Sequence, residues 1–188
     1  VLHDYDGTTW HLGESSWVLH QQLETRGTPI TYYITLEPNN LRVLYALDLP
    51  VRIPDDAFLS TDFELGTHQP VTELKLYKVT SYTDYSYGIG LPAWRRQRDL
   101  KLPDGIDPRA RALVKQWQSA STDAAQIVDD ALTMFHEQPF RYTLQPGAIT
   151  GDNRIDQFLF DTRRGFCEHY ASAFVFLMRA AGIPAHVV

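Results

Sequence analysis

Residues 164–184 read RGFCEHYASAFVFLMRAAGIP, and this stretch decides the fold of the C-terminal half of the chain. Apolar residues fill most of residues 171–180, so a helix built from them is hydrophobic on nearly all sides. Such a helix lies inside a domain rather than on its surface. Gly182 is typical of the position just after a helix, and Pro184 prevents the helix from continuing. The pattern therefore predicts a buried helix over residues 166–181.

The single cysteine of the chain, Cys167, falls in the first turn of this predicted helix, and Gly165 leaves the approach to it uncluttered. First-turn N–H groups have no acceptor within the helix and carry the positive end of its dipole, which stabilises a thiolate. Arg163 and Arg164 add positive potential. The N–H groups of Cys167 and Glu168 can also form an oxyanion hole. A lone cysteine can be an inert, buried thiol, but its place at the helix start favours a nucleophile.

None of the seven histidines is an obvious general base for Cys167. His169 follows it by two residues, about 200° around the helix axis, so the two side chains diverge. His186 lies beyond the far end of a helix that is about 20 Å long, and His136 is expected at the exposed end of another helix. The remaining histidines, His3, His11, His20 and His68, fall in the N-terminal half. The partners of the nucleophile are therefore expected beyond Val188.

Two further helices are predicted before this one. Asp107 and Pro108 have the residue types of an N-cap and of the first helical position, and the helix they open extends through Gln118. Residues 121–123 (STD) cap a second helix, which Pro139 ends. An irregular segment and a short apolar piece, residues 155–160, then lead to the cysteine helix.

The N-terminal half has the pattern of short strands. Residues 30–36 are β-branched and aromatic between turn clusters, and residues 41–47 are expected to pair with them as a hairpin around residues 38–40. Residues 73–80 alternate polar and apolar, as in a half-buried strand. Asp6-Gly7 predicts a tight turn that places Trp10 on the outgoing strand. Strands at this spacing are typical of an antiparallel sandwich or barrel.

These patterns predict an α+β protein with two parts. Residues 1–104 form a β-rich module, and residues 105–188 form the helical part that carries Cys167.

Composition excludes several classes of protein. The chain is 44% hydrophobic and 21% charged, which is typical of a folded globular protein. A net charge of −6 argues against nucleic acid as a partner, and the cluster of Arg95, Arg96 and Arg98 is interpreted as a solvated face. No segment has the pattern of a membrane helix or a signal peptide. The start at Val1 and a strand that opens at residues 185–188 lead us to expect a fragment of a longer protein.

Residues 164–174 and 177–185 strongly resemble the core of the transglutaminase-like superfamily, and more narrowly bacterial membrane-anchored proteins of the TgpA type. The resemblance extends over nearly the whole chain. The upstream segments that carry it are residues 5–10 (YDGTTW), 36–38 (LEP), 46–50 (ALDLP), 139–144 (PFRYTL) and 156–161 (DQFLFD).

The resemblance implies a papain-like Cys-His-Asp triad in which Cys167 is the nucleophile, with the His and Asp on strands after Val188. It implies cysteine-dependent acyl transfer from protein or peptide glutamine to a primary amine, a reaction of the protein-glutamine gamma-glutamyltransferase type. It also implies a membrane-anchored parent protein whose transglutaminase-like domain lies on the periplasmic side of the bacterial inner membrane. With one member of the triad, these 188 residues alone are expected to be inactive.

Two other hypotheses remain open. A cysteine amidase or peptidase would use the same nucleophile with water as the acceptor. A non-catalytic module for peptide or cell-wall binding could use Tyr82, Tyr85, Tyr87 and Trp94 as an aromatic surface, although packing in the β core or its loop is the favoured interpretation of these side chains.

No cofactor and no metal are expected. The spacing of Asp152, Asp156 and Asp161 does not match an EF-hand loop. Asp156 and Asp161 are expected to hold the loop before the cysteine helix.

Overall fold

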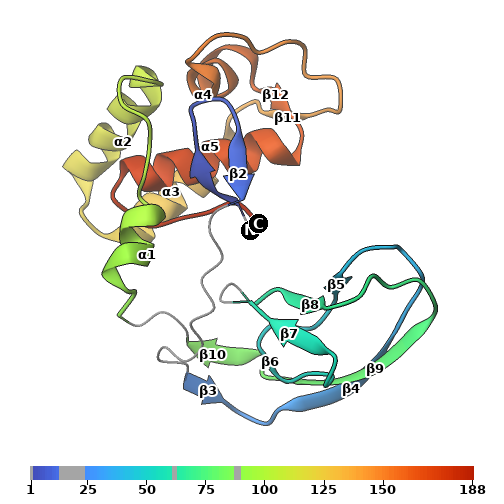
Figure 1. The fold of residues 1–188 in the computed structure, drawn as a ribbon. Helices are drawn as coiled ribbons and strands as arrows, with labels where there is room; N and C mark the ends of the chain where they lie inside the picture. The colour runs from blue at the N-terminus through green and yellow to red at the C-terminus, as the bar shows by residue number, and fades with distance from the viewer. Residues whose placement is uncertain (1, 13–23, 61–62, 87–89) are drawn as a thin grey trace. The chain divides into compact units, whose positions relative to one another are not determined.

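The computed structural model describes residues 2–12, 24–60, 63–86 and 90–188. The chain divides into two compact units. Residues 1–13 and 92–188 form the helical unit, and residues 14–91 form the β unit. Strands and helices are both present (Figure 1), which confirms the predicted α+β class. The division itself differs from the predicted boundary near residue 104, because the first strands of the chain belong with the helices.

These first strands form an antiparallel hairpin of β1 (Leu2–Tyr5) and β2 (Trp10–Leu12). The rings of Tyr5 and Trp10 stack with their centroids 4.7 Å apart. Tyr5 also meets the buried ring of Phe176 edge-on at 6.3 Å. The sequence assigned these residues to a β-rich module because the pattern of a strand does not show which core it covers.

Backbone hydrogen bonds close the hairpin and join it to the last residues of the chain. The N–H of Asp6 donates to the carbonyl of Thr9 at 3.2 Å, which confirms the predicted turn. Leu2 and Val187 exchange two hydrogen bonds of 2.8 and 3.1 Å. Residues that are far apart in sequence therefore lie side by side in one small sheet.

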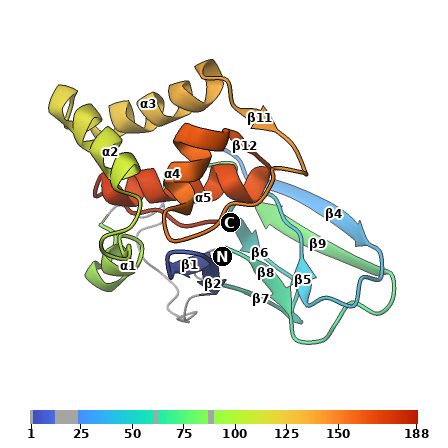
Figure 2. The same ribbon diagram turned by 90° about the horizontal axis from the view of Figure 1, so that it is seen from above.

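The helical unit is built around one central helix. Its helices are α1 (Ala93–Arg98), α2 (Pro108–Ala120), α3 (Ala124–Glu137), α4 (Arg154–Asp156), the π-helix η1 (Gln157–Thr162) and α5 (Cys167–Ala180). In Figure 2, α5 lies between α3 on one side and the β1–β2 hairpin on the other. Residues 175–179 of α5 are all buried. The predicted buried helix is therefore confirmed.

The signals for helix ends act largely as the sequence predicts. Pro108 is the first residue of α2, and the side chain of Asp123 accepts a hydrogen bond from the N–H of Ala125 at the start of α3. After α5, Gly182 has a φ of +79°, and the N–H of Ile183 donates to the carbonyl of Met178 at 2.9 Å. This is the Schellman arrangement that a glycine after a helix favours.

The side chain of Asp107 makes no cap on its own helix, contrary to the prediction. The buried carboxylate of Asp156 takes that role and accepts from the N–H groups of Arg109 at 2.9 Å and Ala110 at 2.7 Å. Asp107 in turn accepts from the N–H of Asp156 at 3.0 Å. The two carboxylates thus latch the start of α2 to the segment before the cysteine, which is the loop-holding role expected of Asp156.

Burial raises the pKa of Asp107 from 3.8 to about 6, although the N–H groups of Asp156 and Ile155 oppose the shift. The folded protein therefore holds this proton up to about pH 6, whereas the unfolded chain has lost it by about pH 4. Unfolding releases a proton in that window, so the contribution of Asp107 to stability falls as pH rises through it.

Replacing Asp107 with asparagine is expected to weaken this pH dependence and to raise the free energy of unfolding at pH 7 by about 1 kcal/mol. One pKa unit corresponds to about 1.4 kcal/mol, and the buried amide N–H groups that asparagine introduces reduce the gain. Chemical denaturation followed by helical circular dichroism between pH 4 and about pH 7 measures both effects. Exposed Asp104 on the same loop provides the control, since Asp104→Asn should leave the profile unchanged. An unaltered profile in the Asp107 variant would contradict the prediction.

The described residues of the β unit form three small antiparallel sheets. Its strands are β3 (Glu24–Arg26), β4 (Ile30–Leu36), β5 (Val43–Leu44), β6 (Pro50–Arg52), β7 (Ala57–Leu59), β8 (Leu65–Thr67), β9 (Lys75–Ser81) and β10 (Asp84–Ser86). The sheet orders are β4-β9-β6, β5-β8-β7 and β10-β3. The buried core of the unit consists of Leu44, Leu65, Val71, Tyr77 and Val79.

Strand β4 confirms the prediction for residues 30–36, but the predicted hairpin partner is wrong. Strand β4 pairs along its whole length with β9, whereas β5 pairs with β8. The N–H groups of Asn39 and Asn40 both donate to the carbonyl of Val71 at 3.0 Å, and this anchors the turn to the segment between β8 and β9. Strand β9 confirms a half-buried strand, with Tyr77 and Val79 buried, but the predicted alternation is only partly correct because Leu74 and Leu76 are exposed.

Candidate active site

Cys167 is the first residue of α5, and it is exposed. Phe166 precedes it in an extended conformation at the N-cap position, and its side chain makes no capping hydrogen bond. The carbonyl of Phe166 accepts the N–H of His169 at 2.9 Å. Helix geometry leaves the N–H groups of Cys167 and Glu168 without acceptors inside the helix. The predicted location of the thiol is therefore confirmed, and its role as nucleophile stays a prediction.

A short parallel ribbon holds the chain just before the cysteine. Strand β11 (Arg141–Tyr142) pairs with β12 (Arg164–Gly165), with Arg141 opposite Arg164 and Tyr142 opposite Gly165. Two backbone hydrogen bonds continue the ribbon at either end: Arg141 N–H to the carbonyl of Arg163 at 2.8 Å, and Thr143 N–H to the carbonyl of Gly165 at 2.7 Å. The start of α5 is thus fixed to the loop that follows α3.

Gly165 has a packing role that the sequence did not reveal. A Cβ atom at this position would lie 2.6 Å from the Cβ of His169 and 2.9 Å from the ring of Phe158. Phe158 is almost fully buried. The close approach of β12 to α5 therefore requires glycine, in addition to any effect of a small residue on access to the thiol.

His169 packs into an aromatic environment. Its ring lies 4.6 Å from the ring of Phe166 and 5.6 Å from that of Phe158. Burial lowers the pKa of His169. Its Nδ1 atom is buried and has no hydrogen-bond partner among the described residues. This environment favours a neutral imidazole that packs, as expected from its divergence from Cys167.

Two of the other described histidines lie next to carboxylates. The Nδ1 atom of His186 lies 3.8 Å from a carboxylate oxygen of Asp99, and His11 lies 2.8 Å from Asp6. His136 is exposed at the end of α3. In the part of the chain that the structure describes, no hydrogen bond joins a histidine to the thiol of Cys167. His20 and the side chain of His3 lie outside the described residues.

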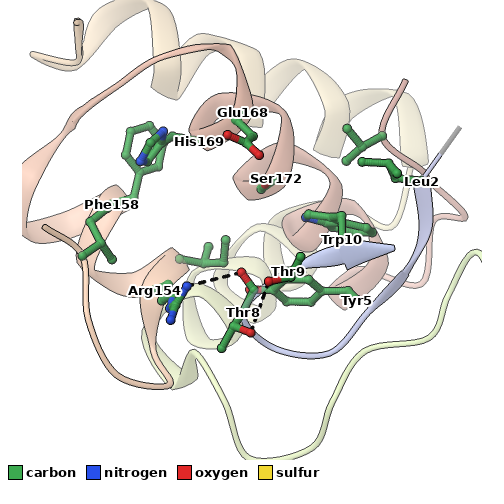
Figure 3. Close-up of a pocket in the computed structure, with 13 residues that line it drawn as sticks. Leu2, Tyr5, Thr8, Thr9, Trp10, Arg154, Phe158, Glu168, His169 and Ser172 are labelled. Atoms are coloured by element: carbon green, nitrogen blue, oxygen red, sulfur yellow. Dashed lines mark hydrogen bonds between the residues drawn. The ribbon is translucent and has the colours of Figure 1, made fainter. Parts of the chain in front are cut away.

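A pocket of about 320 Å³ lies against the side of α5 that carries Glu168, His169 and Ser172 (Figure 3). Its opposite wall includes Trp10 of the hairpin and Arg154 at the start of α4. Glu168, His169 and Ser172 lie about 100–200° around the helix axis from Cys167. A group in this pocket would therefore meet the face of α5 that is turned away from the thiol. Sequence reasoning missed this pocket because its walls are about 150 residues apart.

The three candidate aspartates do not converge. Asp156 caps α2, Asp161 forms an ion pair with Arg109 at 2.7 Å, and Asp152 is exposed. Across the described ranges, no group of three His, Cys, Asp or Glu side chains could hold a metal ion. No described helix is both long enough and apolar enough to cross a membrane.

The predicted aromatic surface stays a prediction. Tyr82 and Tyr85 belong to the β unit and Trp94 to the helical unit. Tyr87 lies outside the described residues. Tyr85 is half-buried, and burial raises the pKa of its hydroxyl.

Comparison with known proteins identifies the families of both parts of the chain. Residues 1–88 match the TgpA N-terminal domain, and residues 111–188 match the transglutaminase-like superfamily. The chain is 40% identical to a protein-glutamine gamma-glutamyltransferase of Pseudomonas aeruginosa PAO1 over 193 residues, which cover all of the chain and 28% of that protein. It is 36% identical to the uncharacterized protein YebA of Bacillus subtilis 168 over 96 residues, which cover 48% of the chain and 13% of YebA. The chain thus spans less than a third of these relatives.

Two crystal structures of the periplasmic domain of TgpA from Pseudomonas aeruginosa have the same fold. The structure bound to ethylmercury superimposes with a TM-score of 0.86 at 38% identity, over 97% of this chain and 65% of that one. The other has a TM-score of 0.87 at 36% identity, over 97% of this chain and 64% of that one. The transglutaminase-like match over residues 111–188 includes the helix that begins with Cys167.

Proposed function

The chain belongs to the transglutaminase-like superfamily as a TgpA-type member, and we propose that its complete protein transfers γ-glutamyl groups from glutamine side chains to primary amines. The observation that carries the proposal is the exposed Cys167 at the first position of a buried helix. The relative named as a protein-glutamine gamma-glutamyltransferase, 40% identical over the whole chain, supports this choice of reaction.

The reaction proceeds in two steps. The thiolate of Cys167 attacks the carbonyl carbon of a glutamine side-chain amide and forms a tetrahedral oxyanion, which the free N–H groups at the start of α5 stabilise. The C–N bond then breaks, the nitrogen takes a proton and leaves as ammonia, and a γ-glutamyl thioester remains on the sulfur. A primary amine attacks the thioester, forms a new amide bond and loses a proton, and the thiol is released.

The remaining members of a Cys-His-Asp triad are proposed to follow residue 188. Within the described residues, His169 packs against aromatic rings, and His186 and His11 lie beside carboxylates. No described histidine is hydrogen-bonded to the thiol of Cys167. A general base that accepts the thiol proton and an acid that protonates the departing nitrogen are both needed for the two steps. We therefore expect the 188 residues alone to react with thiol reagents and to show no transfer activity.

We further propose that the complete protein is anchored in the bacterial inner membrane, with this chain on the periplasmic side. The support is that both similar crystal structures are of periplasmic domains. Donor and acceptor would then be a glutamine-containing protein or peptide and a primary amine of the cell envelope, including those associated with the cell wall.

The test compares amine incorporation with ammonia release by the complete protein. A glutamine peptide and a fluorescent primary amine should give the cross-linked product, with one ammonia released for each amine incorporated. The same peptide with asparagine in place of glutamine is the matched control and should react at least about 10-fold more slowly, because its carbonyl is one methylene closer to the backbone. Ammonia without incorporation would identify an amidase that uses water, and neither product would favour a binding module.

A further inference from the structure

The β11–β12 ribbon places Arg141 beside Arg164, which is three residues before the nucleophile. Arg141 and Arg164 are paired in register, and neighbouring strands lie about 4.8 Å apart. In-register residues of adjacent strands project from the same face of a sheet. Both side chains are exposed. Three residues span at most about 10 Å, so the pair lies close to Cys167.

Nothing in the described residues neutralises these two charges. Neither guanidinium has an ion pair or a hydrogen bond there. Asp161, three residues before Arg164, is already bound to Arg109 at 2.7 Å. Like charges on neighbouring strands destabilise a sheet, and the ribbon is only two residues long. An unpaired basic pair is unexpected in a chain with a net charge of −6.

The third arginine of this region, Arg163, is in a different situation. Its Nε donates to the carbonyl of Leu159 at 3.2 Å, and its guanidinium lies 5.9 Å from the ring centroid of Phe140. Arg163 therefore has a structural role that explains it. Arg141 and Arg164 have no such role, and their guanidinium groups remain available to a ligand.

The other face of the ribbon is aromatic. Tyr142 is 65% exposed and stacks on Tyr170 with centroids 6.4 Å apart. Tyr170 is three residues after Cys167, on the same side of α5. The two arginines and this aromatic pair therefore lie on opposite faces of the ribbon, and a chain that reaches the thiol along the arginine face would meet the two positive charges.

We propose that Arg141 and Arg164 bind a carboxylate of the acyl donor and so make acidic peptides the preferred glutamine substrates. The guanidinium fork matches a carboxylate in bidentate geometry, and a carboxylate between the two arginines would offset their repulsion. The inference rests on the proposed function, since it specifies the donor of that reaction. Binding can nevertheless be measured without turnover.

The first experiment measures binding to the chain with Cys167→Ala, which prevents acylation. Two fluorescent glutamine peptides are compared, one with glutamate on both sides of the glutamine and one with serine there. The acidic peptide should bind about 10-fold more tightly, and the double variant Arg141→Gln/Arg164→Gln should lose this preference. Arg42→Gln, at an exposed arginine of the β unit, should keep it. Equal affinity for both peptides in the parent chain would overturn the proposal.

The second experiment separates a peptide from a membrane as the source of the anion. Vesicles with about one third anionic lipid are added to the same variants, since exposed arginines also bind acidic headgroups. The proposal expects peptide binding to depend on Arg141 and Arg164, with vesicle binding unaffected by their replacement. Loss of vesicle binding with unchanged peptide binding would assign the pair to a membrane surface and refute a donor site.

In the complete protein, the double variant should raise KM for the acidic donor about 10-fold and change kcat less than about 2-fold, because the arginines bind the donor and do not touch the reacting amide. If no donor is turned over at all, the proposed transferase function fails, and the binding result still decides the role of the pair. If donors are turned over but KM is unchanged, the transferase stands and this inference fails.

Discussion

Replacing Cys167 with alanine is expected to abolish amine incorporation by the complete protein, with kcat lowered at least about 10⁴-fold. The thioester requires a sulfur nucleophile, and removal of a nucleophile from a catalytic triad costs several orders of magnitude. Assays that are quenched at fixed times and detect the incorporated amine measure this loss of activity. Cys167→Ser keeps the shape of the side chain and should also be inactive, because its hydroxyl is a much weaker nucleophile than a thiolate.

The stability of the alanine variant provides the control. Because Cys167 is exposed in the first turn of α5, its loss leaves no cavity, and the free energy of unfolding should change by less than about 0.5 kcal/mol. A folded, inactive variant would assign the loss to chemistry. A folded variant that keeps the cellular activity of the parent would contradict the enzyme proposal and favour a peptide-binding or cell-wall-binding role.

Replacing Gly165 with alanine is expected to lower the free energy of unfolding by about 3 kcal/mol, at the upper end of the cost of overpacking. The added methyl would overlap the Cβ of His169 at 2.6 Å. That atom is attached directly to the backbone of α5, so relief requires the ribbon and the helix to separate. In the complete protein, the same movement should reduce kcat, because it displaces the start of the helix at Cys167.

Chemical denaturation measures this cost, and Gly147 offers a matched control. Gly147 has a φ of +86° and nothing within 4 Å of an added Cβ. Gly147→Ala should therefore cost only the backbone strain, roughly 1–2 kcal/mol. A loss in Gly165→Ala no larger than in Gly147→Ala would show that the contact with His169 relaxes without cost.

Local signals in the sequence were sufficient for the three long helices, α2, α3 and α5, but not for the short α1, α4 and η1. Buried α5 follows from an uninterrupted apolar run, and Pro108, Asp123 and Gly182 act at the helix ends as their chemistry predicts. Strand pairing was less predictable. Strands β4 and β9 are about 40 residues apart, and the intervening residues 38–40 resemble a hairpin turn. The carbonyl of Val71 accepts hydrogen bonds from both N–H groups of the turn and so directs the chain away from a hairpin with β4. Val71 is distant in sequence, so the turn residues alone do not reveal this contact.

The same distinction holds at the candidate site. The position of Cys167 could be predicted because a helix start is a local feature. The need for glycine at position 165 could not be predicted, since it depends on how closely β12 approaches His169. The pairing of Arg141 with Arg164 was equally hidden, because strands of two residues leave no pattern in a sequence. Asp107 had the right residue type for a cap, but a carboxylate 49 residues away took the role.

The two backbone hydrogen bonds between Leu2 and Val187 have a consequence for the order in which the chain folds during synthesis. The helical unit is discontinuous, and residues 14–91 form a continuous insertion within it. The β unit can therefore fold as soon as it leaves the ribosome, since domains generally fold as units. Among these residues, strand β1 is made before its partner at Val187 and the ring of Phe176, which are synthesised more than 170 residues later, so it is completed only after them. Until then a newly made hairpin exposes Tyr5 and Trp10.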